Sequence, residues 1–131
     1  MKIYTTYFGN LRKIPKDIIP IAICAKPPVG YTGIHFKSLC PSYTAFQAYK
    51  SDKDFETFRQ NYYSDVLAYQ DADYLVTGVF QKVSYGKDVA LVCFEKNPKE
   101  CHRSILAEWL GRYGYHVEEW QNVSCDSQHG V

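Results

Sequence analysis

The chain has 131 residues, of which 46% are apolar, 16% aromatic and 22% charged, a composition typical of a globular domain and not of a disordered or fibrous chain. It contains no apolar run of about 18 residues, and its first residues lack the apolar stretch of a signal peptide, so we expect neither a membrane span nor secretion. The five cysteines are an odd number. Together with the missing export signal, they predict reduced thiols and a cytoplasmic location.

The formal net charge of +1 hides an asymmetry along the chain. Residues 1–50 hold seven basic residues and one acidic residue, whereas residues 51–131 hold eight basic and thirteen acidic residues. A basic face of this kind can concentrate an anionic ligand. The two halves can equally neutralise each other where they touch, so the charge pattern leaves both interpretations open.

The N-terminal part of the chain predicts two strands. Residues 2–8 are rich in β-forming side chains and end at a Gly-Asn turn signal. Residues 18–25 are nearly all apolar, which suits a strand covered on both faces. Residues 29–43 contain two glycines and a proline, and we expect them to form a long loop.

The middle of the chain predicts helices. A short helix is expected within residues 44–49, and a longer one over residues 53–69, with Asp52 as its N-cap and apolar side chains at helical spacing. Arg59 lies within that apolar stripe, where it either extends its charged end into water or binds an anion. A further helix is expected to run from about residue 71 to residue 84.

The last third of the chain predicts a strand over residues 88–94, a helix over residues 98–113 and a strand over residues 115–120. Such a unit forms a right-handed crossover between parallel strands. We therefore expect an α/β fold: one three-layer domain over residues 1–120, with a short, mostly parallel sheet of about four strands flanked by helices. A polar C-terminal tail is expected over residues 121–131.

The junction between this strand and helix carries complete helix-start signals. Asn97 is a good N-cap, Pro98 suits the first helical position, and Glu100 can complete a capping box, so the helix is predicted to begin at Pro98. These three residues are expected to support the site structurally. Helical geometry then places His102 at the centre of the apolar stripe, with Cys101 and Arg103 on either side.

The start of this helix is where we expect chemistry. A helix N-terminus favours an anion, keeps an imidazole neutral and lowers the pKa of a thiol. Cys101 is therefore the predicted nucleophile, His102 the predicted proton-transfer residue and Glu95 its orienter, while Arg103 is predicted to bind an anion. Cys93, near the strand end, is expected to be an inert core thiol.

Other sites of known type do not fit the spacing. In a phosphatase or rhodanese loop, one cysteine and one arginine bracket an oxyanion, but Cys93 lies too far before Arg103 and Cys101 too close to it. Zinc needs four ligands, and Cys93, Cys101 and His102 could converge with Cys24 or Cys40, but the sequence has no CxxC pair. A Walker A loop and a dinucleotide fingerprint are also missing, so no metal and no cofactor are predicted.

Three predicted strand ends bring basic side chains to one edge of the sheet. Ligands of open parallel sheets bind beyond the carboxyl ends of the strands. The loops that leave these ends hold Arg12, Lys13, Lys16, Lys26, Lys96, Lys99 and Arg103, with Tyr7, Phe8, Tyr31 and Phe36 among them. Basic groups interleaved with aromatic rings suit a flat anionic ligand, such as a nucleotide or single-stranded nucleic acid, better than a metal.

The sequence also resembles a known family. The segment CFEKNPKECHRSILAEWL is similar to the signature of domain-of-unknown-function family 488 (DUF488) in its YeaO-like subgroup, as are the stretches YTTYFGN and ICAKPPVGY. The resemblance implies a compact α/β fold and a shared site at Cys93, Glu95, Cys101, His102 and Arg103. It implies no activity.

We therefore predict a basic pocket at the strand ends that binds an anionic small molecule, nucleotide or nucleic acid, with Arg103, Lys26, Arg12 and Arg59 as anion ligands and Cys/His-based catalysis in addition. One alternative is a non-catalytic nucleic-acid binding module. Another is a purely structural Cys-His-Arg helix cap, in which His102 is a hydrogen-bonded core residue. Arg103 would then pair with one of the neighbouring glutamates. No membrane partner is expected, and the sequence leaves the oligomeric state open.

Overall fold

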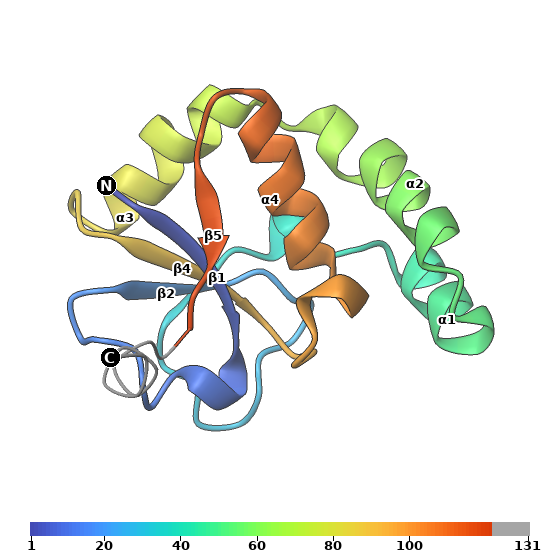
Figure 1. Cartoon of the computed structure of the whole chain (residues 1–131), viewed down its shortest axis with the longest axis horizontal. Coiled ribbons are helices and arrows are strands. Elements are labelled where there is room, and N and C mark those ends of the chain that lie inside the picture. The colour runs from blue at the N-terminus through green and yellow to red at the C-terminus, as the bar shows by residue number, and fades with distance from the viewer. Residues whose placement is uncertain (122–131) are drawn as a thin grey trace, which may run out of the picture.

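Five short strands form one all-parallel sheet in the order β3-β2-β4-β1-β5 in the computed structural model, which describes residues 1–121 (Figure 1). The strands are β1 (Ile3–Tyr7), β2 (Ile19–Ala22), β3 (Ile34–His35), β4 (Val89–Cys93) and β5 (Val117–Glu119). The expected α/β fold with a parallel sheet is confirmed. The fifth strand is β3, which lies inside the segment expected to be a loop and is too short for a periodic signal.

The strand register sets which residues share the carboxyl edge of the sheet. Every residue of β4 is buried, as expected for a central strand covered on both faces. β1 pairs with β4 from Ile3 opposite Val89 to Tyr7 opposite Cys93. The two strands therefore end at the same level, and Cys93 lies at the carboxyl edge beside Tyr7.

Most helices pack on one face of the sheet. They are α1 (Tyr43–Asp52), α2 (Phe55–Asp65), α3 (Gln81–Val83) and α4 (His102–Arg112), with a π-helical segment, η4 (Tyr74–Phe80), leading into α3. Short 3-10 turns are η1 (Phe8–Asn10), η2 (Lys37–Leu39), η3 (Leu67–Tyr69) and η5 (Pro98–Glu100). In Figure 1, α1 and α2 extend beyond the end of the sheet.

The cap of α2 differs from the expected one. Lys53 adopts a left-handed conformation with φ 57° and ends α1, and Asp54 follows as the N-cap of α2. The side chain of Asp54 accepts a hydrogen bond of 3.2 Å from the amide of Thr57. Asp52, the predicted cap, is instead the last residue of α1. The helix predicted over residues 53–69 is shorter at both ends, because α2 spans Phe55–Asp65.

Two hydrophobic clusters cover the two faces of the sheet. The larger one joins Leu91 to side chains of the helices, including Phe80, Leu106 and Leu110. The smaller cluster holds four buried residues that come from β4 and the loop before β2: Ile14, Ile18, Ala90 and Val92. A loop with one 3-10 turn therefore covers the second face.

The predicted start of the last helix is wrong by one turn. Pro98–Glu100 forms the 3-10 turn η5, Cys101 is extended with φ −133° and ψ 146°, and α4 begins at His102. Asn97 does act as a cap, but of η5: its side chain accepts a hydrogen bond of 3.0 Å from the amide of Lys99. The extended backbone of Cys101 separates η5 from α4, and its sulfur lies against that of Cys93.

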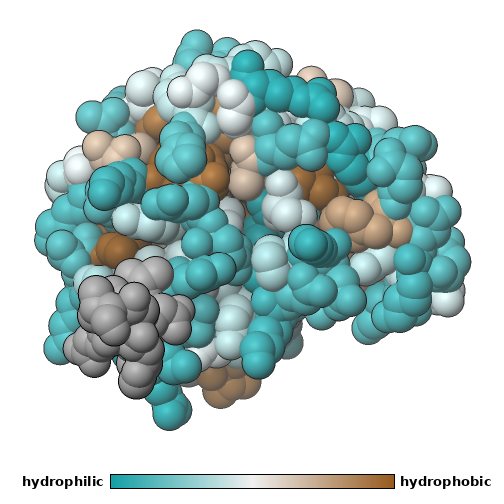
Figure 2. Space-filling model, viewed as in Figure 1, coloured by the Kyte–Doolittle hydropathy of each residue, from teal (hydrophilic) through white to brown (hydrophobic). Residues whose placement is uncertain are grey.

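The face of the molecule drawn in Figure 2 is mainly polar. Figure 2 shows hydrophilic residues over most of one face, with apolar side chains visible in the recesses between them. Over residues 1–121, every helix is too short or too polar to cross a bilayer.

Candidate functional site

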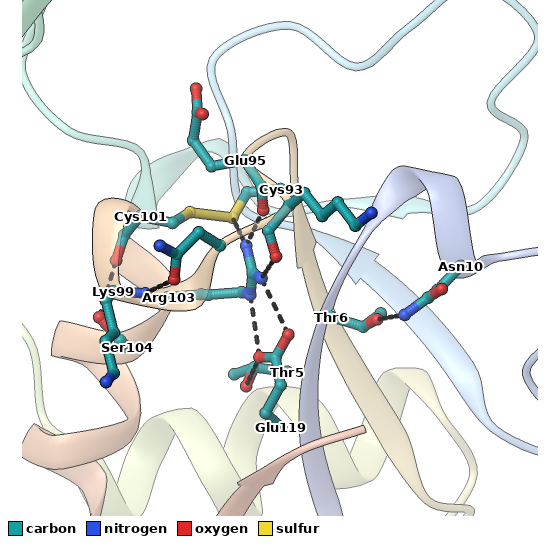
Figure 3. Close-up of polar contacts among 12 residues, drawn as sticks. Thr5, Thr6, Asn10, Cys93, Glu95, Lys99, Cys101, Arg103, Ser104 and Glu119 are labelled. Atoms are coloured by element: carbon teal, nitrogen blue, oxygen red, sulfur yellow. Dashed lines mark hydrogen bonds and ion pairs between the residues drawn. A yellow bond between two sulfur atoms is a disulfide. The ribbon is translucent and has the colours of Figure 1, made fainter. Parts of the chain in front are cut away.

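Arg103 lies at the centre of a buried polar network at the start of α4 (Figure 3). Its Nε and Nη2 donate to the two carboxylate oxygens of Glu119 at 3.0 and 2.8 Å. Nη1 donates to the carbonyl of Glu95 and, at 3.4 Å, to Sγ of Cys93, and Nη2 also donates to the carbonyl of Lys96. All five N–H donors of the guanidinium therefore have protein partners.

Glu119 was not singled out by the sequence, yet it is the main partner of Arg103. It lies at the end of β5, and Thr5 of β1 donates a hydrogen bond of 2.8 Å to its Oε1. The sequence pointed instead to Glu95 or Glu100, which are closer to Arg103 along the chain. Only the pairing of β1 with β5 in the folded sheet brings Glu119 to the guanidinium.

Cys93 and Cys101 form a disulfide, so the expectation of reduced thiols and of an inert Cys93 is corrected (Figure 3). The chain folds back through η5, which brings the start of α4 to the end of β4. The sequence separation of 8 residues gives no sign of this contact. Cys24 is a buried free thiol and Cys40 a half-buried one.

His102 is buried beside the sulfur pair and is held in one orientation. Its Nε2 lies 2.8 Å from the carbonyl oxygen of Ile23. Because a carbonyl only accepts, Nε2 carries the proton and Nδ1 presents its lone pair. Nδ1 lies 3.8 Å from Sγ of Cys101, and the ring packs edge-on against Tyr62.

Burial lowers the pKa of His102 to about 4, with a smaller contribution from the charge of Arg103. The hydrogen bond to Ile23 acts in the opposite direction but is outweighed. The imidazole is therefore neutral near pH 7, as the helix-start argument predicted. With so low a pKa, the imidazole of His102 is a weak proton acceptor near pH 7. Its unprotonated Nδ1 keeps a lone pair that can bind another group.

Glu95, Glu100 and Pro98 were also predicted at this junction, and in the described part of the chain none of their side chains forms a hydrogen bond with His102. The carboxylates of Glu95 and Glu100 are exposed, and the contribution of Glu95 to the network is its main-chain carbonyl. Pro98 opens η5. Among residues 1–121, no hydrogen bond joins the Glu95 carboxylate to His102; the imidazole is oriented by Ile23 instead.

The predicted anion ligands are not brought together at one point. Arg59 pairs with Glu108 across the contact of α2 with α4, and its guanidinium lies over the ring of Tyr63. Arg12 and Lys26 are exposed in the loops that follow β1 and β2, near the carboxyl edge of the sheet. Arg103 is enclosed by the polar network described above.

Aromatic side chains gather at the same carboxyl edge. The ring of Phe8 lies 4.8 Å from that of Phe94 and 5.5 Å from that of Tyr31. Phe94 directly follows Cys93 in the sequence and is 51% exposed. Tyr31 is anchored by its hydroxyl, which donates a hydrogen bond of 2.6 Å to the carbonyl of Ile34. We call these three rings the aromatic cluster.

Two pockets lie away from this edge. One is at the amino ends of β1 and β5, lined in part by Lys2, Tyr115 and His116. The other is shallow and lies between α2 and α4, around Tyr63 and Arg112. Neither pocket includes a residue of the sulfur pair.

The fold is α/β, and Cys101, His102 and Arg103 lie buried at a strand-to-helix junction. The chain matches the model of the DUF488-N3a family, described as the active DUF488-N3 subclade, over residues 3–114. The chain therefore belongs to the DUF488 family, as its signature predicted. No curated protein and no solved structure shows significant similarity to it.

Proposed function

We propose that the protein binds an anion that carries a planar base, a nucleotide or single-stranded nucleic acid, at the carboxyl edge of the sheet, and acts on it with Cys93, Cys101 and His102. The observation that carries the proposal is the position of this centre at the same edge as the aromatic cluster and exposed basic side chains. The description of the matched subclade as active supports catalysis.

The aromatic cluster supports recognition of a base. Phe94 leaves half of its surface free while Phe8 and Tyr31 hold its surroundings in place. Stacking of a base on an aromatic side chain contributes about 1–3 kcal/mol and tolerates every base. A planar ligand is therefore favoured over a compact anion such as phosphate alone.

Exposed basic side chains support recognition of the anionic part. Arg12, Lys26 and Lys96 lie in the loops that leave the carboxyl ends of β1, β2 and β4. Charges placed around such an edge attract phosphates from solution and weaken in effect as salt rises. Because the donors of Arg103 are fully engaged, we assign Arg103 to holding the centre in place, and Arg59 to joining α2 and α4.

The centre works in its reduced state. The disulfide has no free thiolate, so a cellular dithiol must first supply two electrons and two protons to convert the bonded sulfurs into two thiols. Cys101 immediately precedes α4, where the helix field favours the thiolate. The contact of Arg103 with Sγ of Cys93 favours the charged form of that sulfur as well.

The test combines binding with turnover. Reduced protein is titrated with mononucleotides and with short single-stranded oligonucleotides, and products are followed by mass spectrometry. Arg12→Ala and Lys26→Ala should each weaken binding about fivefold, the effect of roughly 1 kcal/mol. The control is Lys87→Ala, an exposed lysine just before β4 at the opposite edge, which should bind as wild type does.

The titrations with mononucleotides and with oligonucleotides distinguish a nucleotide ligand from a nucleic-acid ligand. Affinity for mononucleotides supports a nucleotide, whereas affinity for oligonucleotides alone, falling steeply with salt, supports nucleic acid. Turnover that is lost in Cys101→Ser supports catalysis at this centre. Binding without any turnover supports the non-catalytic module, and equal affinity in all three lysine and arginine variants contradicts the proposed edge.

A further inference from the structure

We infer that the reduced centre binds a thiophilic divalent cation of the zinc class, with Cys93, Cys101 and His102 as its protein ligands. The ligand atoms of these three residues all lie within 4.8 Å of one another, and all three side chains are buried. Two thiolates and one imidazole are a ligand set that zinc enzymes use. The inference concerns the same site as the proposed function and shares its premise that the reduced sulfurs are the working state.

The orientation of His102 is that of a metal ligand. Histidines that bind a metal through one ring nitrogen usually donate the other N–H to a carbonyl or carboxylate, which fixes the ring and its tautomer. Nε2 of His102 donates to the carbonyl of Ile23 in this way. Nδ1 faces the sulfurs, and residues 1–121 offer it no hydrogen-bond donor once Cys101 is in the disulfide.

Charge balance favours a cation between the two sulfurs. Reduction and ionisation of Cys93 and Cys101 place two negative charges in a buried site, which is costly without a counterion. Arg103 contacts Cys93, but its charge is already paired with Glu119. A divalent cation offsets both thiolates and holds them in their charged form.

The backbone spacing fits a shared metal. The Cα atoms of Cys93 and Cys101 lie 7.6 Å apart. Two thiolates that share zinc are joined through two metal–sulfur bonds of about 2.3 Å each, so their backbones stand farther apart than those of two directly bonded sulfurs. The end of β4 and the start of α4 can therefore hold the metal where they are.

The ligand count points to an open coordination position. Within the described part of the chain, no fourth histidine, cysteine or carboxylate ligand atom joins the group. Three protein ligands with one position left for water or substrate are the pattern of catalytic zinc, whereas structural zinc is closed by four. Under the proposed function, this position takes water or an anionic group of the bound ligand, and both sulfurs act as metal ligands.

Cobalt(II) titration of the reduced full-length chain, in the presence of a phosphine reductant, tests the inference. Wild type should bind one cobalt per chain, with thiolate-to-cobalt charge-transfer absorption and the visible bands of tetrahedral cobalt. Zinc should displace the cobalt. Each of three variants should weaken cobalt binding more than about 100-fold: Cys93→Ser, Cys101→Ser and His102→Asn. Loss of a residue that only hydrogen-bonds to a metal ligand already costs about 10- to 100-fold in metal affinity, and these variants remove the ligand itself.

Two controls keep the result independent of folding. Oxidised wild type has both sulfurs in the disulfide and should bind no cobalt, although its fold is the one described. Cys24→Ser removes a buried thiol outside the group and should bind as wild type does. Reduced wild type without the charge-transfer band, or Cys93→Ser with an unchanged band, overturns the inference.

The test separates this inference from the proposed function. Cobalt binding requires no nucleotide, and nucleotide binding depends on Arg12 and Lys26, which lie outside the ligand group. A protein that binds nucleotides but no metal retains the proposed edge and loses the metal. A protein that binds cobalt but no nucleotide shows the reverse.

Discussion

Arg103 and Glu119 form a two-pronged ion pair that ties the first turn of α4 to the end of β5. The guanidinium is completely buried, whereas the carboxylate keeps 23% of its exposure. This pair also fixes Arg103 against Cys93 and the carbonyls of the loop that follows β4. Glu119, near the end of the described chain, therefore helps to fix the position of Arg103 beside Cys93.

Replacement Glu119→Gln should strongly destabilise the fold. It removes the charge that compensates a fully buried guanidinium, and breaking a buried pair in this way costs about 3–5 kcal/mol. Because Glu119 is partly exposed, we expect about 2–3 kcal/mol, measured by urea unfolding. The matched control is Glu118→Gln. Glu118 is the exposed neighbour of Glu119 in the sequence, and its replacement should change stability by less than about 0.5 kcal/mol. Similar losses in both variants contradict the role given to the pair.

The stability of metal-free protein should depend on pH through His102. The pKa of this histidine is about 4 in the folded chain against 6.5 as the ordinary value, so the unfolded chain binds more protons between these values. Stability is then fully present above pH 6.5 and falls as the pH drops toward 4, by an amount on the order of 3 kcal/mol. His102→Gln should flatten this dependence in chelator-treated protein. An unchanged slope in the variant rules out His102 as its source.

Two neighbouring tyrosines of α2 should respond differently to loss of their hydroxyl groups. Tyr62 is buried and donates a hydrogen bond of 2.7 Å to the carbonyl of Leu39, so Tyr62→Phe should cost about 1 kcal/mol. The buried hydroxyl of Tyr63 has no hydrogen-bond partner within residues 1–121, so Tyr63→Phe should be neutral or stabilising. Thermal and urea unfolding compare the two. Equal losses contradict this assignment.

The disulfide makes a chemical prediction for unreduced protein. After denaturation and alkylation without reductant, digestion should release Cys93 and Cys101 in one cross-linked product, while Cys24 and Cys40 are alkylated. Prior reduction should label all four. Alkylated Cys93 in the unreduced sample indicates that the pair is reduced as isolated.

Much of the fold follows from local sequence. The apolar run that becomes β4 and the stripe that becomes α4 are long enough to identify their elements, and the crossover between them dictates a parallel sheet. β3 has only two residues and exists because Ile34 and His35 pair with β2, a contact that no local pattern encodes. α4 starts at His102 and not at Pro98, because the extended residue Cys101 interrupts the helical path after η5, and the capping signals before it do not encode that break.

The residues predicted to form the site do lie together at the junction of β4 with α4, and their functional role stays a prediction. Cys101, His102 and Arg103 were identified from their position at a helix start, and the neutral state of His102 follows from its surroundings in the fold. Glu119 and the bond to Cys93 could not be foreseen, because each depends on segments that meet only after the sheet has formed. Spacing rules for zinc also fail here, since one ligand comes from a strand and two from the next helix start.

X-ray absorption at the zinc edge identifies the metal ligands in reduced protein loaded with one equivalent of zinc. We expect two sulfur ligands at about 2.3 Å and imidazole nitrogen at about 2.0–2.1 Å, with a further light atom in the open position. A zinc shell of nitrogen and oxygen alone, or one sulfur after loading of the intact reduced chain, would contradict a centre built on Cys93, Cys101 and His102.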